Sequence, residues 1–158
     1  MERLWSPWRN EYVTDSDGGE GCVFCVHLDE GDDEASHILH RGVTAFVILN
    51  AYPYNTGHLM VAPLRPVGEL HALEPDERAE LMELTTRSTE IVREALGAHG
   101  FNIGMNLGQV AGAGIPGHLH VHVVPRWGGD TNFMPVVGDT KVLPEMIADT
   151  DAKLRGLF

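Results

Sequence analysis

The sequence predicts an α+β domain in which an antiparallel sheet of about five strands packs with one long and one short helix. Two observations support this prediction: five short segments have the apolar patterns of strands, and one segment after Pro75 carries apolar residues at helical spacing. The 158 residues are 43% apolar and 22% charged, which is ordinary for a protein with one core. We therefore divide the chain into an N-terminal arm, residues 1–21, and a single domain, residues 22–158.

Three strands are predicted in the first half of the chain. Residues 36–41 and 43–49 form two strands joined by a tight turn at Gly42. The segment 51–57, with its Pro and Gly, interrupts the pattern, and a third strand follows over residues 57–62. The charged run Asp29–Glu34 is predicted to be a solvated loop.

The long helix is predicted to begin at Pro75, a residue that suits a first helical turn, and to end near Gly97. Its periodic apolar face is predicted to pack on the core. Residues 101–107 then alternate as a fourth strand, with Phe101, Ile103, Met105 and Leu107 facing inward and Asn102, Gly104 and Asn106 facing outward. Residues 144–154 have enough periodicity for the short helix.

The fifth strand, residues 118–125, carries the chemistry. His118, His120 and His122 alternate with aliphatic residues, so the three imidazoles are expected on one face, about 6.5 Å apart. A row of rings suits an extended, multiply charged ligand such as a polyphosphate. Because like charges at this spacing lower each other's pKa, at least one ring is expected to be neutral and nucleophilic near pH 7. We predict His120, whose tautomer a backbone carbonyl would fix.

Two further motifs flank this strand and the arm. The Gly-rich segment 108–117 leads into the histidines, and its small residues would let backbone amides approach an anion. Cys22 and Cys25, in a Cys-x-x-Cys motif, are either half of a zinc site or a pair of buried thiols.

The stretch His-Leu-His-Val-His-Val-Val resembles the signature of the histidine triad proteins, a family of nucleotide hydrolases and transferases. Residues 45–50 and 56–66 resemble the fragile histidine triad branch, which hydrolyses diadenosine polyphosphates. Residues 4–9 and 127–134 instead resemble a bacterial branch that includes diadenosine tetraphosphate phosphorylases. Gly114 and Ile115 stand where hydrolase relatives often carry Gln and Ser or Thr, but on balance we expect hydrolysis, with phosphorolysis as the alternative.

The resemblance implies roles for particular side chains. His120 would attack the α-phosphorus to give a nucleotidyl-histidine intermediate, while His118 and His122 donate hydrogen bonds to phosphoryl oxygens or help to protonate the leaving group. Five residues would bind substrate: Asn50 the ribose hydroxyls, His58 and Asn106 the phosphates, and Phe24 and His27 the adenine. The family's usual state implies a homodimer.

The resemblance also bears on cofactors. No metal is required for the chemistry, and magnesium is expected only as a companion of the substrate. Zinc-containing relatives complete a structural site with a histidine just after the third strand and with the first triad histidine. Here Pro66 occupies the former position, although His118 remains. His71 or His40 could substitute for the missing histidine beside Cys22 and Cys25.

Composition limits the partners. A net charge of −12 with only two lysines argues against nucleic acid and anionic membranes as partners. No segment approaches the apolar length of a membrane span, and the first residues lack the apolar run of a signal peptide, so a cytoplasmic location is expected. Two other functions stay open: a nucleotide-binding regulator with negligible turnover, and a metalloprotein that works through Cys22, Cys25 and His118.

Overall fold

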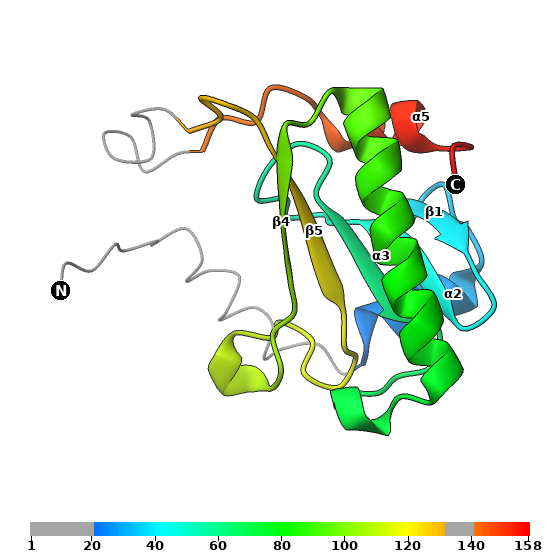
Figure 1. Ribbon diagram of the computed structural model, residues 1–158. Coiled ribbons are helices and arrows are strands. Elements are labelled where there is room, and N and C mark those ends of the chain that lie inside the picture. Colours follow the sequence, from blue (N-terminus) through cyan, green and yellow to red (C-terminus); the bar gives the residue numbers. More distant parts are fainter. Residues whose placement is uncertain (1–20, 132–140) are drawn as a thin grey trace, which may run out of the picture.

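The computed structural model describes residues 21–131 and 141–158. Five antiparallel strands form one sheet in the order β1-β2-β3-β5-β4, which confirms the predicted fold class (Figure 1). The strands span Ile38–Arg41, Ala45–Leu49, Leu59–Pro63, Gly100–Gly104 and Val121–Arg126, in the order β1 to β5. The predicted arm lies outside the described residues apart from Gly21, and so does the part of the segment 127–134 from residue 132 on.

The long helix, α3 (Pro75–Leu96), lies across one face of the sheet (Figure 1). It begins with a capping box between Glu74 and Glu77 and ends at Gly97, whose left-handed φ of 65° stops the helix. Its buried face joins the main core cluster, which includes Val47, Val61, Leu81, Leu84, Val92, Leu119, Val121 and Val123. The prediction of this helix, and of the core role of the aliphatic residues in the histidine stretch, is therefore confirmed.

A second helix, α2 (Val23–Glu30), covers the opposite face of the sheet. Phe24 anchors it in a smaller core cluster with Phe46, Ile48 and Met60. The sequence analysis missed this helix, because eight residues with one buried side chain leave no clear helical period. It also makes the predicted loop over Asp29–Glu34 partly wrong, since the first two of those residues end the helix.

The turn between β1 and β2 is tight, as predicted, and is closed by the Gly42 N–H donating to the Ala45 carbonyl at 2.8 Å. The inward face predicted for the fourth strand is only half right. Phe101 and Met105 pack against the main core, but Ile103 and Leu107 are 51% and 41% exposed. The reason is that β4 lies at the edge of the sheet and ends at Gly104.

The short C-terminal helix, α5 (Ile147–Leu154), starts three residues later than predicted. Its Asp151 carboxylate accepts a hydrogen bond from Nδ1 of His37 at 2.7 Å and is paired with Arg155, which fastens the helix to the start of β1. Within the described ranges, no helix combines the length and hydrophobicity needed to cross a membrane.

Candidate active site

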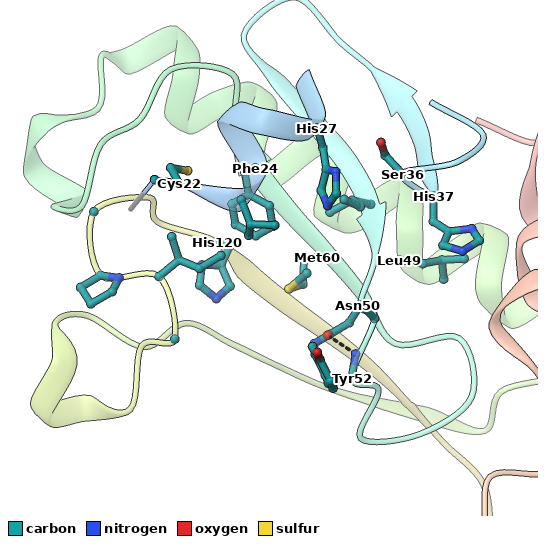
Figure 2. A pocket seen from close by; sticks show the side chains of 18 of the residues that line it. Cys22, Phe24, His27, Ser36, His37, Leu49, Asn50, Tyr52, Met60 and His120 are labelled. Atoms are coloured by element: carbon teal, nitrogen blue, oxygen red, sulfur yellow. Dashed lines mark hydrogen bonds between the residues drawn. The ribbon is translucent and has the colours of Figure 1, made fainter. Parts of the chain in front are cut away.

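A cavity of about 690 Å³ opens between α2, the end of β2 and the Gly-rich segment before the histidines (Figure 2). Its wall is largely apolar on one side, with Phe24, Ile48 and Met60, and carries Asn50 and Tyr52 on another. His120 lines the cavity beside Gly114–Gly117. A volume of this size and mixed polarity suits a small ligand with an apolar ring and a polar end.

His120 has one nitrogen fixed and the other available. Its Nδ1–H donates to the carbonyl oxygen of His118 at 2.9 Å, so the neutral ring carries its lone pair on Nε2. Burial lowers the pKa of His120, and this outweighs the bond to His118, which acts to raise it. The predicted neutral middle histidine and its carbonyl partner are thus both present, but burial rather than neighbouring charge keeps the ring neutral.

His122 and His58 form a directed pair beside His120. The Tyr54 N–H donates to Nδ1 of His58 at 3.0 Å, so a neutral His58 carries its proton on Nε2, which lies 3.0 Å from Nδ1 of His122. His122 then carries its own proton on Nε2. Its ring centroid lies 4.9 Å from that of His120. Burial, and then the imidazoles of His122 and His120, lower the pKa of His58 to about 3.

Local chain geometry places His58 against His122. Gly57 has a φ of 73°, a left-handed conformation that favours glycine, and an added Cβ would lie 2.7 Å from Cδ1 of Leu96. His58 comes directly before β3, which begins at Leu59 and in which Met60 is the register partner of His122 on β5. The Tyr54 ring stacks on the buried His58 ring with a centroid separation of 4.9 Å.

The expected row of three histidines facing one ligand is wrong for His118. Its ring is completely buried, its Nε2–H donates to the Pro63 carbonyl at 2.7 Å, and its Nδ1 lies 3.0 Å from Sγ of Cys22. The rings of His118 and His120 both pack against Phe24 of α2, as expected for residues on one face, but His118 is completely covered there and does not line the cavity. Burial lowers the pKa of His118.

Cys22, Cys25 and His118 form the group of potential metal ligands in the described part of the chain. Their ligand atoms lie within 4.8 Å of one another, a separation compatible with one ion bonded at about 2.3 Å to sulfur and about 2.0 Å to nitrogen. Since Nε2 of His118 is held by a backbone carbonyl, its Nδ1 lone pair faces the thiols, as in metal-ligating histidines. These three residues therefore fit a zinc ion.

The two substitute ligands suggested by the sequence are wrong. The His40 ring stacks on Phe158 with a centroid separation of 6.0 Å, and His71 is exposed on a short turn before α3. Neither belongs to the group around Cys22. Burial, and then the hydrogen bond with Cys22, raise the pKa of the Cys25 thiol to about 11.

Among the predicted substrate contacts, Phe24, His27 and Asn50 line the cavity, and Figure 2 shows them around its interior. The edge of Phe24 packs against His120, with a centroid separation of 5.4 Å. The side-chain oxygen of Asn50 accepts the Tyr52 N–H at 2.9 Å, so this residue also forms the turn after β2.

Asn106 lies apart from these residues. Its Nδ2 donates to the carbonyl of Gly112 at 3.2 Å, and the residue is not among those lining the cavity. The sequence analysis also missed Tyr54, which fixes the His58 tautomer, since nothing in the irregular segment before β3 marks it out.

Comparison with known proteins identifies the family of this chain. The HIT domain family model matches residues 33–129, more than half of the chain. An AP-4-A phosphorylase of Mycobacterium tuberculosis is 42% identical over 158 residues, which cover 95% of this chain and 80% of that protein. A bis(5'-nucleosyl)-tetraphosphatase of Schizosaccharomyces pombe is 32% identical over 91 residues, covering 58% of this chain and 50% of that protein.

A solved structure agrees as well. A Zn-bound histidine triad family protein from Mycobacterium smegmatis superimposes with a TM-score of 0.70 and 26% identity, over 87% of this chain and 92% of that chain. The fold shared with this structure points to the same family as the His-Leu-His-Val-His-Val-Val signature of this chain. This chain belongs to the HIT domain family.

Proposed function

We propose that this protein cleaves dinucleoside polyphosphates, diadenosine compounds in particular, by nucleotidyl transfer through His120. One observation carries the proposal: a neutral imidazole on the cavity wall whose Nδ1–H is held by a carbonyl and whose Nε2 lone pair is therefore positioned as the nucleophile. The substrate class is supported by two relatives whose names identify them as enzymes of such dinucleotides, the AP-4-A phosphorylase and the bis(5'-nucleosyl)-tetraphosphatase.

In the first step, Nε2 of His120 attacks the α-phosphorus of the substrate. The new P–N bond forms as the bond from this phosphorus to the bridging oxygen breaks, and the remaining nucleoside polyphosphate leaves. The Nδ1–H stays on the ring and keeps its hydrogen bond to the His118 carbonyl, which stabilises the positive charge of the substituted imidazole.

His122 is the donor to the leaving oxygen or to the phosphoryl oxygens. Its Nδ1 accepts from His58, so its Nε2–H is the proton it offers. The phosphate role predicted for His118 is withdrawn, because both of its ring nitrogens are already engaged. The same proposal assigns the nucleoside ring to the wall formed by Phe24 and His27, and the ribose hydroxyls to Asn50. For Asn106 we retain the predicted phosphate contact. Because this residue does not line the cavity, the contact requires the segment after β4 to move towards the bound substrate.

In the second step, an acceptor oxygen attacks the phosphorus and releases His120. Water gives a nucleoside monophosphate, and orthophosphate gives a nucleoside diphosphate. The sequence alone favours water. We assign orthophosphate as the acceptor, because the similarity to the AP-4-A phosphorylase extends over 95% of this chain, whereas that to the tetraphosphatase covers 58%.

Product analysis tests both steps. Diadenosine tetraphosphate is incubated with the protein, with and without orthophosphate, and the nucleotides are separated. With orthophosphate, the expected products are ATP and ADP in equal amounts. Without orthophosphate, no more than about one equivalent of ATP per active site is expected, because the nucleotidyl-histidine then lacks its acceptor. AMP as the main product in the presence of orthophosphate would identify a hydrolase, and the absence of turnover in both would identify a nucleotide-binding regulator.

Further proposals concern bound metals, cellular location and oligomeric state. Zinc is assigned to Cys22, Cys25 and His118, where it would fasten the start of α2 to the histidine strand. Magnesium accompanies the substrate and needs no protein ligand. The protein is proposed to act in the cytoplasm as a homodimer, whose interface would cover the exposed Ile103 and Leu107 on and beside the edge strand.

A further inference from the structure

The metal group of Cys22, Cys25 and His118 has three ligands, whereas a closed structural zinc site has four. The whole chain contains two cysteines and nine histidines, and all of them lie in the described ranges. A fourth sulfur or nitrogen ligand would therefore have to be one of the eight remaining histidines.

The structure places every one of those histidines elsewhere. His120, His122 and His58 form the catalytic cluster. The others have separate surroundings: His27 beside Glu30, His37 on Asp151, His40 on Phe158, His71 on the surface and His99 accepting the Gly128 N–H. No described carboxylate joins the group either. Position 66, where the family resemblance places the fourth ligand, holds an exposed proline, which has no side-chain donor atom.

The missing position is accessible to small molecules. Cys22 and Cys25 are both partly exposed, and Cys22 lines the same cavity as His120 and the residues Gly114–Gly117. The only fully buried member is His118, whose ring is held from behind by the Pro63 carbonyl. An ion on these ligands would thus be supported from the protein side and open towards the cavity or solvent.

We propose that the zinc site of this chain is an open, three-ligand site that takes a small exogenous donor, a water molecule or a monodentate nitrogen or anionic ligand, in its fourth position. Two thiolates, one imidazole and one exchangeable ligand are the donor set of an open zinc centre, not of a closed structural one. The inference rests on the zinc assignment made above, but it concerns ligand exchange and assigns the metal no part in the transfer reaction.

Cobalt substitution tests the inference. The full-length protein, purified without an affinity tag, is loaded with one equivalent of Co²⁺, and its visible spectrum is recorded during a titration with imidazole. An open site is expected to give a saturable spectral change, with the metal content unchanged after desalting. Pro66→His offers the missing donor, and is expected to abolish the change and to slow metal removal by a chelator about tenfold or more.

Matched variants make the outcome decisive. His71→Ala removes an exposed histidine and should titrate like the parent protein, whereas Cys22→Ser should lose cobalt binding. If cobalt binds but imidazole leaves the spectrum unchanged, the open site is wrong and the zinc assignment stands. If neither cobalt nor zinc binds, both are wrong. Should Pro66→His fail to fold, as judged by its thermal transition, the titration of the parent protein still decides the inference.

Discussion

At the scale of single residues, hydrogen bonds to the main chain determine which ring nitrogen of each site histidine carries the proton. The His118 carbonyl holds Nδ1–H of His120, the Tyr54 N–H fixes His58, and the Pro63 carbonyl fixes His118. A backbone N–H can only donate and a carbonyl can only accept, so each imidazole has one tautomer compatible with its partner. The position of the His120 lone pair, on Nε2, is thereby defined before any substrate binds.

Replacing the proposed nucleophile, His120, should abolish turnover without abolishing nucleotide binding. In His120→Ala, turnover of diadenosine tetraphosphate is expected to fall by several powers of ten, because the covalent step is lost, while nucleotide binding by calorimetry persists. His118→Ala keeps its carbonyl and should retain more activity. Reactions of the parent protein quenched in alkaline denaturant should carry label on His120, because the P–N bond of the intermediate is stable to base and labile to acid. Label on another histidine would contradict the assignment.

The buried His58 should make stability depend on pH. Its pKa is about 3 in the folded protein against an ordinary 6.5, so only the unfolded chain takes up this proton as the pH falls below 6.5. The contribution of neutral, buried His58 to the free energy of unfolding is therefore fully present above pH 6.5 and is lost progressively as the pH falls towards 3. Between pH 7 and pH 5 the free energy of unfolding should drop by about 2 kcal/mol from this residue alone.

Denaturant unfolding of the parent protein and of His58→Gln at both pH values measures this effect. The variant should show a smaller drop, with a remainder from His118 and His120, whose pKa values are also lowered by burial. His71→Gln, at an exposed site, serves as the control and should follow the parent. Equal drops in His58→Gln and the parent would show that His58 is not the group responsible.

At the scale of secondary structure, long periodic segments were predictable and short ones were not. The helix α3 follows from 22 residues of periodic apolar character, and the five strands from their patterns. The helix α2 is too short for such a signal and is stabilised by Phe24 in a cluster with distant Phe46 and Met60. The direction of the His118 ring does not follow from local periodicity, since it depends on thiols 96 and 93 residues away in sequence. Only the family resemblance, which makes the first triad histidine a possible zinc ligand, pointed to these thiols.

One side chain of α3 holds the first hairpin in place. The Glu80 carboxylate accepts hydrogen bonds from the Val43, Thr44 and Ala45 N–H groups and from the Thr44 hydroxyl. Burial would raise the pKa of Glu80, but these bonds hold it below its usual value. This set of hydrogen bonds from residues 43–45 to Glu80, called the clamp below, therefore depends on an ionised carboxylate, which only accepts.

Glu80→Gln should weaken this clamp, because an amide NH₂ would face backbone donors. We expect the free energy of unfolding to fall by about 1–3 kcal/mol, measured by denaturant titration at pH 7. The matched control is Glu83→Gln on the exposed side of the same helix, which should change stability by less than about 0.5 kcal/mol. Similar losses in both variants would mean that the helix charge, and not the clamp, is responsible.

At the scale of the whole molecule, the two edges of the sheet differ. At the β1 edge, α5 is fastened to the start of the strand through Asp151 and His37, whereas β4 forms the other edge and carries exposed Ile103. Leu107 and the fully exposed Val110 continue this apolar surface beyond the strand. An edge strand with exposed aliphatic side chains is a template for pairing with another chain.

Placing a charge on this edge should separate the proposed dimer. Ile103→Glu is expected to sediment as a monomer at concentrations at which the parent protein is dimeric, because a carboxylate would be buried in the interface. Val43→Glu changes an exposed aliphatic residue on the first hairpin and should leave the assembly unchanged. A parent protein that sediments as a monomer at all concentrations would disprove the homodimer.

The hydrogen bond between His120 and the His118 carbonyl has a consequence for how this sequence can change. Every amino acid carries that carbonyl, so no codon change at position 118 removes the group that sets the nucleophile's tautomer. The imidazole of His118, by contrast, serves only the thiols and Pro63. If the proposed zinc site were lost, the first histidine of the signature could therefore be replaced while the tautomer of His120 is preserved.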